Sequence, residues 1–294
     1  MSALLQGAYD LHIHAAPDVI PRKLDIKDLA QAAAQAGMAG IALKDHTTST
    51  AGRCYVLNRL LPKGLIFYGC LALNPTVGGI NPLAVESFLR EGGSIVYMPT
   101  YGAANHIRRW GLGKSPTDFP IAKGFQGLTI LDEVSRLTPE CDPILRLIKK
   151  HDAVLATGHI SPEESLALLR KARDVGIKRM LVTHASESVT PMALDQQKEV
   201  VQLGAMIEHC FFAATEACPE PIRIEEIRDQ INFVGASNVI LSSDLGQMTN
   251  RSPVDGFSHY LKKLIAVGTR EDEVKLMISE NPRRLLAPAD PQSN

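Results

Sequence analysis

The sequence predicts an α/β fold, a single (β/α)8 barrel of the TIM type, and three observations lead to this prediction. Short apolar, β-branched runs alternate with amphipathic stretches along the chain, which is typical of parallel strands joined by crossover helices. Eight such runs can be counted, and the stretches between them leave no segment for a second domain. The length of 294 residues suits one large barrel.

The predicted strands are short runs rich in Val, Ile and Leu. They cover Tyr9–His14, Gly40–His46, Leu65–Leu73, Ser94–Thr100, Ala153–His159, Arg179–Ala185, Ala205–Phe211 and Val239–Leu245. Between them, apolar residues at i, i+3 and i+4 predict amphipathic helices, for example from Asp25, Pro162 and Glu225. A glycine follows each of these three patterns, as it often does just beyond a helix.

One connection is much longer than the others. Residues 101–138, after the fourth strand, are rich in Gly, Pro and aromatic residues. Because long loops inside compact domains are usually functional, we expect this segment to be an active-site loop over the barrel mouth. The barrel domain is expected over residues 1–287, followed by a disordered tail at 288–294.

The composition narrows the classes of partner. Apolar residues make up 45%, charged residues 21%, and the net charge is -1, which gives no electrostatic footprint for nucleic acid or an anionic membrane. A small-molecule substrate is expected, and a homo-oligomer is left open. The five cysteines form no C-x-x-C pair and are expected to be reduced. No apolar run approaches the roughly 20 residues of a membrane helix, and no signal peptide is visible, so a cytoplasmic location is expected.

Polar residues gather where the predicted strands end, which in a barrel is the active-site face. They are His12 and His14 on the first strand, Asp45 and His46 on the second, His159 on the fifth, His184 on the sixth, Glu208 and His209 on the seventh, and Asp244 on the eighth.

A metal site is the first interpretation of these residues. His12 and His14 are two apart on a strand, so both imidazoles point into the barrel and could bind one ion, for which zinc is well suited. Asp244 lies in an apolar run, where its charge needs a metal or an ion-pair partner. His159 and His184 would converge with them, although either histidine alone could be a hydrogen-bonded core residue.

Three more residues are candidates for a metal ligand or a substrate contact. His46 could bind metal, or could cap the following helix together with its neighbouring threonines. Lys44 faces inward on the second strand and could place a cation near the substrate. Glu208 and His209 cannot both point inward, because adjacent strand residues face opposite sides, and we favour Glu208 as the inward one.

The long connection offers a recognition cluster. Tyr101, His106, Arg108 and Arg109 are candidate substrate-binding residues, since an arginine could hold a carboxylate or phosphate. The alternative is that the two arginines lie on a solvated helix face.

The order of these residues resembles the amidohydrolase superfamily of metal-dependent hydrolases. The resemblance rests on His12-x-His14, on His159, His184 and Asp244, and on the helical ending ISENPRRLL. It implies that these four histidines and Asp244 bind one or two divalent metals, and that Asp244 accepts the proton of the attacking water. The fourth strand, SIVYMPT, lacks the bridging lysine or glutamate of many members, so a single metal is the simpler expectation.

A second, local resemblance concerns the first two strands. DLHIHAAPD and ALKDHTTSTAG are similar to motifs of the polymerase and histidinol phosphatase family, but LIFYGCLALN and SSDLGQ lack that family's later ligands. This resemblance adds His46 to the candidate ligands.

Together, the residues and the resemblance predict a hydrolase. A divalent cation lowers the pKa of its water towards roughly 7 and polarises the scissile group. Zinc is the first choice, with manganese, iron and cobalt as alternatives. We expect cleavage of a C–N bond in a small amide, cyclic amide or imide, with Asp244 as general base and then acid. The alternatives are a phosphoesterase, a lactonase, or a non-catalytic metal-binding barrel.

Overall fold

The computed structural model describes residues 3–60, 64–111 and 124–286. The predicted tail at 288–294 and residues 112–123 of the predicted long loop therefore lie outside the described residues. None of the described helices combines the length and the apolar character that crossing a membrane requires.

Eight parallel strands form one sheet in sequence order, from β1 to β8. They are β1 (Tyr9–Ile13), β2 (Gly40–Leu43), β3 (Ile66–Ala72), β4 (Ile95–Tyr97), β5 (Val154–Ala156), β6 (Met180–Val182), β7 (Met206–Cys210) and β8 (Val239–Ser242). Just beyond β8, Leu245 makes a parallel bridge with Ile13 and accepts a 2.9 Å hydrogen bond from His14 N, which brings β8 back to β1. The predicted barrel is confirmed.

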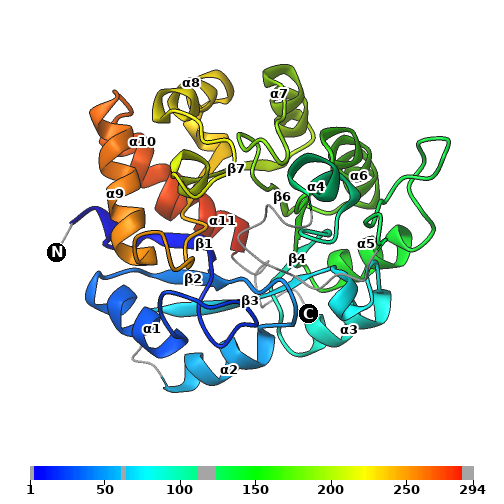
Figure 1. The fold of residues 1–294 in the computed structure, drawn as a ribbon, viewed down its shortest axis with the longest axis horizontal. Coiled ribbons are helices and arrows are strands. Elements are labelled where there is room, and N and C mark those ends of the chain that lie inside the picture. Colours follow the sequence, from blue (N-terminus) through cyan, green and yellow to red (C-terminus); the bar gives the residue numbers. More distant parts are fainter. Residues whose placement is uncertain (1–2, 61–63, 112–123, 287–294) are drawn as a thin grey trace.

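Helices surround the strands (Figure 1). They are α1 (Ile26–Gln35), α2 (Ala51–Leu60), α3 (Pro82–Arg90), α4 (Ala104–Trp110), α5 (Cys141–Lys150), α6 (Pro162–Val175), α7 (Leu194–Gln202), α8 (Ile224–Val234), α9 (Pro253–Ala266), α10 (Glu271–Lys275) and α11 (Asn281–Leu286), with a π-helical turn at Leu276–Glu280 and short 3-10 turns at Ala3–Leu5, Pro75–Val77, Phe211–Ala214 and Ala236–Asn238.

The predicted helix starts and stops have clear local causes. α1 begins after Asp25, whose side chain accepts a 2.8 Å hydrogen bond from Asp28 N. α6 begins with a capping box, in which Ser161 and Glu164 satisfy each other's backbone N–H groups. It ends at Gly176, whose φ of 92° lies in the left-handed region that glycine adopts without strain.

The end of the barrel interior that lies opposite the strand C-termini is filled by a separate apolar cluster. Inward side chains from the strands, among them Leu11, Tyr97 and Ile240, pack there with Leu285 and Leu286 of α11. Figure 1 shows α11, in red, reaching the middle of the ring of strands. The helix thus closes the end of the barrel opposite the strand C-termini and leaves the other end for the polar residues.

β1 carries a bulge that changes which residues face inward. Between Asp10 and Ile13, three steps along β1 match two along β2. Leu11 therefore packs inside the barrel while Ile13 packs outside, against the surrounding helices. The extra residue lets His12 and His14 face the barrel interior, on the side of Leu11 nearer the strand C-termini. There both imidazoles contact Asp244.

The closing helix gives the first testable prediction. Leu285 is only 4% exposed inside the barrel, so Leu285→Ala should lower the free energy of unfolding by about 2–5 kcal/mol through lost burial and a cavity. Leu194→Ala, at a 42% exposed position of α7, should change it by less than about 0.5 kcal/mol. Urea denaturation measures both variants, and equal effects would show that α11 does not contribute as part of the core.

Candidate metal centre

Three buried ligand groups meet where β1 and β8 end. Asp244 Oδ1 lies 3.0 Å from His14 Nε2 and 3.3 Å from His12 Nε2. Each of the three side chains can offer one ligand atom, and these atoms lie within 4.8 Å of one another. Two imidazoles and one carboxylate are a common ligand set for zinc, so the residues fit a divalent cation.

A second group shares Asp244. Its other oxygen, Oδ2, lies 3.9 Å from His184 Nε2, and His184 Nδ1 lies 2.6 Å from Glu187 Oε1. Both His184 Nδ1 and Glu187 Oε1 are buried, and neither makes a hydrogen bond of acceptable geometry within the described ranges. His184, Glu187 and Asp244 therefore form a second group that could hold a cation, and the two oxygens of Asp244 face different groups.

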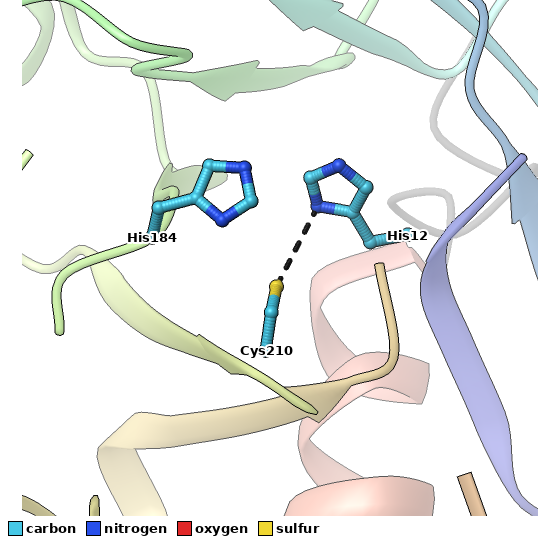
Figure 2. A group of neighbouring side chains, drawn as sticks. All are labelled: His12, His184 and Cys210. Atoms are coloured by element: carbon cyan, nitrogen blue, oxygen red, sulfur yellow. Dashed lines mark hydrogen bonds between the residues drawn. The ribbon is translucent and has the colours of Figure 1, made fainter. Parts of the chain in front are cut away.

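A third group of possible metal ligands includes the thiol of Cys210. Figure 2 shows Cys210, at the end of β7, between His12 and His184, with its Sγ 3.7 Å from His12 Nδ1. The thiol is fully buried, which raises its pKa well above the usual range. A buried thiol beside two imidazoles could add a soft ligand, which favours zinc over magnesium or calcium.

The backbone is strained at two of these residues. His184 has φ of 59° and Asp244 has φ of 50°, a left-handed conformation that few residues other than glycine adopt. The same turn needs Gly246, because a Cβ there would lie 2.2 Å from the carbonyl oxygen of His14. Such strain persists where the surrounding structure fixes a functional geometry.

The ring of His12 is oriented by a carboxylate that contacts its Nδ1. Glu208 Oε2 lies 3.0 Å from His12 Nδ1, and Glu208 Oε1 accepts a 2.7 Å hydrogen bond from Ser242 Oγ. A carboxylate on Nδ1 orients the ring and leaves Nε2 as the ligand atom. Of the adjacent pair on β7, Glu208 is thus the inward residue, while His209 contacts Ser186 Oγ at 3.0 Å.

Lys44 also reaches this histidine. Its Nζ lies 2.8 Å from His12 Nε2 and 4.7 Å from the centre of the Tyr97 ring. Burial lowers the pKa of Lys44, against the opposing effects of Asp244 and Glu208. Burial thus favours the neutral amine of Lys44 beside His12 Nε2.

The protonation states suit metal binding. Burial would raise the pKa of Asp244, but His12 and then His14 hold it well below its usual range, so the carboxylate is ionised. Burial lowers the pKa of His14 to about 3 and lowers that of His12 as well, so both rings keep a lone pair for a ligand bond. The second group differs. Burial raises the pKa of Glu187, and Glu187 raises the pKa of His184 against the effect of burial, so both residues favour forms that must lose a proton before a cation binds.

A second layer of aromatic side chains lies beside these groups. His46 stacks between His14 and Tyr101, with ring centres 4.7 and 3.9 Å away, and His159 Nδ1 lies 2.8 Å from His106 Nδ1. His159 is near His184, at 5.0 Å between ring centres, but it belongs to none of the three groups found among the described residues. The Nε2 atoms of His46, His106 and His159 are buried without hydrogen-bond partners in the described chain, so they could face a substrate.

The two arginines of α4 lie elsewhere. Arg108 and Arg109 are exposed, and Arg108 Nη2 donates a 2.9 Å hydrogen bond to Asn105 Oδ1. The structure therefore brings Tyr101 and His106 to the site, but it places these arginines on the solvated face that the sequence left open as the alternative. His46 does not cap the next helix either, because its Nδ1 contacts Thr100 Oγ1 at 2.8 Å, while Ser49 Oγ accepts the hydrogen bond of Ala51 N where α2 begins.

Sequence reasoning missed Glu187 and the position of Cys210. Cys210 had a usable signal, since it lies two residues after Glu208 on one strand and so shares its inward face. Glu187 had none, because it lies in an irregular turn and reaches the site through the unusual backbone of His184.

Solved structures with the same architecture include several enzymes. An amidohydrolase from Pseudomonas aeruginosa is similar with a TM-score of 0.64 at 12% identity, over 96% of both chains. The organophosphorus hydrolase from Deinococcus radiodurans has a TM-score of 0.58 at 14% identity, over 97% of this chain and 94% of that chain. The 2,6-dihydroxybenzoate decarboxylase from Rhizobium has 0.55 at 13% identity, over 96% and 98%. At such identities the likeness shows the barrel fold alone.

Comparisons of sequence give a family but no activity. No curated protein sequence matches this chain. The local resemblance to the polymerase and histidinol phosphatase family is not shown by these comparisons. Residues 7–208, most of the chain, match the model of one family, described as a family of unknown function. The chain therefore belongs to this family, DUF6282.

Proposed function

We propose that this protein is a metal-dependent hydrolase that cleaves a C–N bond in a small amide, cyclic amide or imide. The observation that carries the proposal is the convergence of His12, His14 and Asp244 at the C-terminal ends of barrel strands, with the carboxylate 3.0 and 3.3 Å from the two imidazoles. Catalytic zinc sites typically use three such protein ligands and keep a further position open.

The residues divide into ligands and supports. His12, His14 and Asp244 would hold a first divalent cation, with zinc as our first choice and manganese, iron or cobalt as alternatives. His184 and Glu187, with the second oxygen of Asp244, would hold another. A cation held there would acidify a water molecule and polarise the scissile carbonyl.

Asp244 is the proposed proton carrier. The carboxylate is ionised, so it could accept a proton from the attacking water once a cation lowers the pKa of that water. It would then deliver this proton to the leaving nitrogen. Glu208 fixes the ring of His12, and the layer of His46, Tyr101, His106 and His159 would contact the substrate.

Other reactions use the same residues. A lactone carbonyl or a phosphoester would need the same nucleophile and the same oxygen polarisation, so lactonase and phosphoesterase activity are the alternatives. The fold hosts hydrolases and a decarboxylase among the similar structures, so fold alone does not choose the bond. A non-catalytic metal-binding barrel is a third candidate.

One experiment separates these candidates. The purified protein is analysed for metals by plasma mass spectrometry, stripped with a chelator, and reconstituted with zinc, manganese, iron or cobalt. Each form is then screened against amides, cyclic amides, imides, lactones and phosphoesters. Metal-dependent turnover of a C–N substrate supports the proposal, turnover of esters alone selects an alternative, and bound metal without turnover favours the non-catalytic barrel.

Substitution of the proton carrier gives a second prediction. Asp244→Asn preserves size and removes the basic oxygen, so kcat should fall by roughly 10²- to 10⁴-fold while the protein still folds. The control Asp229→Asn changes an aspartate whose side chain is 65% exposed on α8 and should leave kcat unchanged. An Asp244→Asn enzyme that keeps its metal and loses less than about tenfold in kcat would remove Asp244 from proton transfer.

A third prediction concerns the second group. Glu187→Gln keeps the shape of the side chain but removes its charge, so metal content should fall from about two ions per chain to about one. Glu91→Gln, at an exposed position after α3, should not change the metal content. If the wild-type protein holds a single ion and Glu187→Gln retains it with unchanged affinity, Glu187 is not a ligand.

A further inference from the structure

A buried arginine lies in the connection between β1 and α1. The side chains of Arg22 and Asp18 are each 1% exposed, and Arg22 Nε donates a 2.7 Å hydrogen bond to Asp18 Oδ2. Asp18 Oδ1 in turn accepts a 3.2 Å hydrogen bond from Ile20 N. The carboxylate thus fixes one edge of the guanidinium and is itself fixed by the loop.

The connection places Arg22 next to the metal centre. Its backbone bridges to Gln247, and the following residue, Lys23, donates a 2.8 Å hydrogen bond from its N–H to Gly246 O. Gln247 Nε2 donates a 2.8 Å hydrogen bond to the carbonyl oxygen of Asp244. Arg22 therefore packs against the turn that begins at Asp244.

Arg22 has donor capacity that the protein does not use. Its Nη2 is buried and has no hydrogen-bond partner in the described part of the chain. A guanidinium carries five N–H donors in a planar fork, and an unpaired buried donor is unfavourable. Arg53 provides the contrast, since its donors are bonded to Asp45, to the Thr48 hydroxyl and to the carbonyl of Pro17.

We propose that Arg22 is the anion-binding group of the active site, and that the substrate carries a carboxylate or a phosphate held by the unpaired Nη2 of the Arg22 guanidinium. The planar fork matches two oxygens of such an oxyanion. Asp18 holds the fork in place through Nε. This inference rests on the proposed function, because it assumes that the substrate binds at the centre formed by His14 and Asp244.

The sequence led us to expect an arginine that binds an acidic group of the substrate, and Arg22 could take this role. The arginines expected to hold an acidic group, Arg108 and Arg109, are exposed on α4. Arg22 is buried instead, in a loop that pairs with the turn after Asp244, and the Asp18 carboxylate already orients its guanidinium. If the Asp18–Arg22 pair were only a scaffold for the loop, its replacement would change stability and leave the affinity for anions unaltered.

The test is an anion titration of the metal-loaded protein. Inorganic phosphate and acetate are titrated separately by calorimetry, which distinguishes the two sources of oxyanion. Arg22→Met should weaken the binding of at least one of them about tenfold or more, because it removes charge-assisted hydrogen bonds. Arg22→Lys keeps the charge but not the fork and should fall between. Arg109→Met should stay within about twofold of the wild type.

Two controls keep the outcome decisive. Arg22→Met leaves the Asp18 carboxylate buried and unpaired, so the double variant Asp18→Asn/Arg22→Met is measured beside it to avoid a folding defect from that charge. Metal content is measured for every variant. If the wild type binds no metal, the proposed function is refuted, and the same titrations of the metal-free proteins decide on Arg22. A wild type that binds neither anion, or an Arg22→Met affinity within about twofold of wild type, overturns the inference.

Discussion

The closure of the barrel between β1 and β8 is the constraint on which the site depends. Asp244 N donates a 2.8 Å hydrogen bond to His12 O, and Asp10 Oδ1 accepts from Ser243 N at 3.0 Å. These bonds fix the register of the two strand ends, and the register in turn brings the Asp244 carboxylate against the imidazoles of His12 and His14. The ligand group is therefore a consequence of closing the barrel, and any shift of β8 along β1 would separate its members.

Many polar residues lie buried together above the apolar part of the barrel interior. Carboxylates and imidazoles are among them, and burying polar groups is unfavourable unless each finds a partner. Several do not, since Glu187 Oε1 and His184 Nδ1 are close but make no proper hydrogen bond in the described chain. A cation would satisfy both atoms, and its binding would offset the cost of assembling them.

Much of this arrangement could be predicted from the sequence. Parallel strands and their C-terminal ends follow from apolar runs and helix periodicity, and these patterns placed His12, His14 and Asp244 correctly at one end of the barrel. The sequence could not reveal the bulge in β1, because a bulge depends on pairing with β2 rather than on local composition.

The positions of site residues in turns could not be predicted from the sequence either. Glu187 and Arg22 lie in connections without periodicity, and their direction depends on backbone angles and on contacts with distant loops. For Arg108 and Arg109 the residue type suggested anion binding, but the face of a helix that meets solvent is decided by what it packs against.

Each oxygen of Asp244 faces a different group of possible ligands. β4 continues into Met98 and Pro99, which offer no carboxylate or amine that could bridge two cations. Asp244 instead has Oδ1 towards His12 and His14 and Oδ2 towards His184. A carboxylate that faces two groups of ligands can perform the bridging role from the eighth strand.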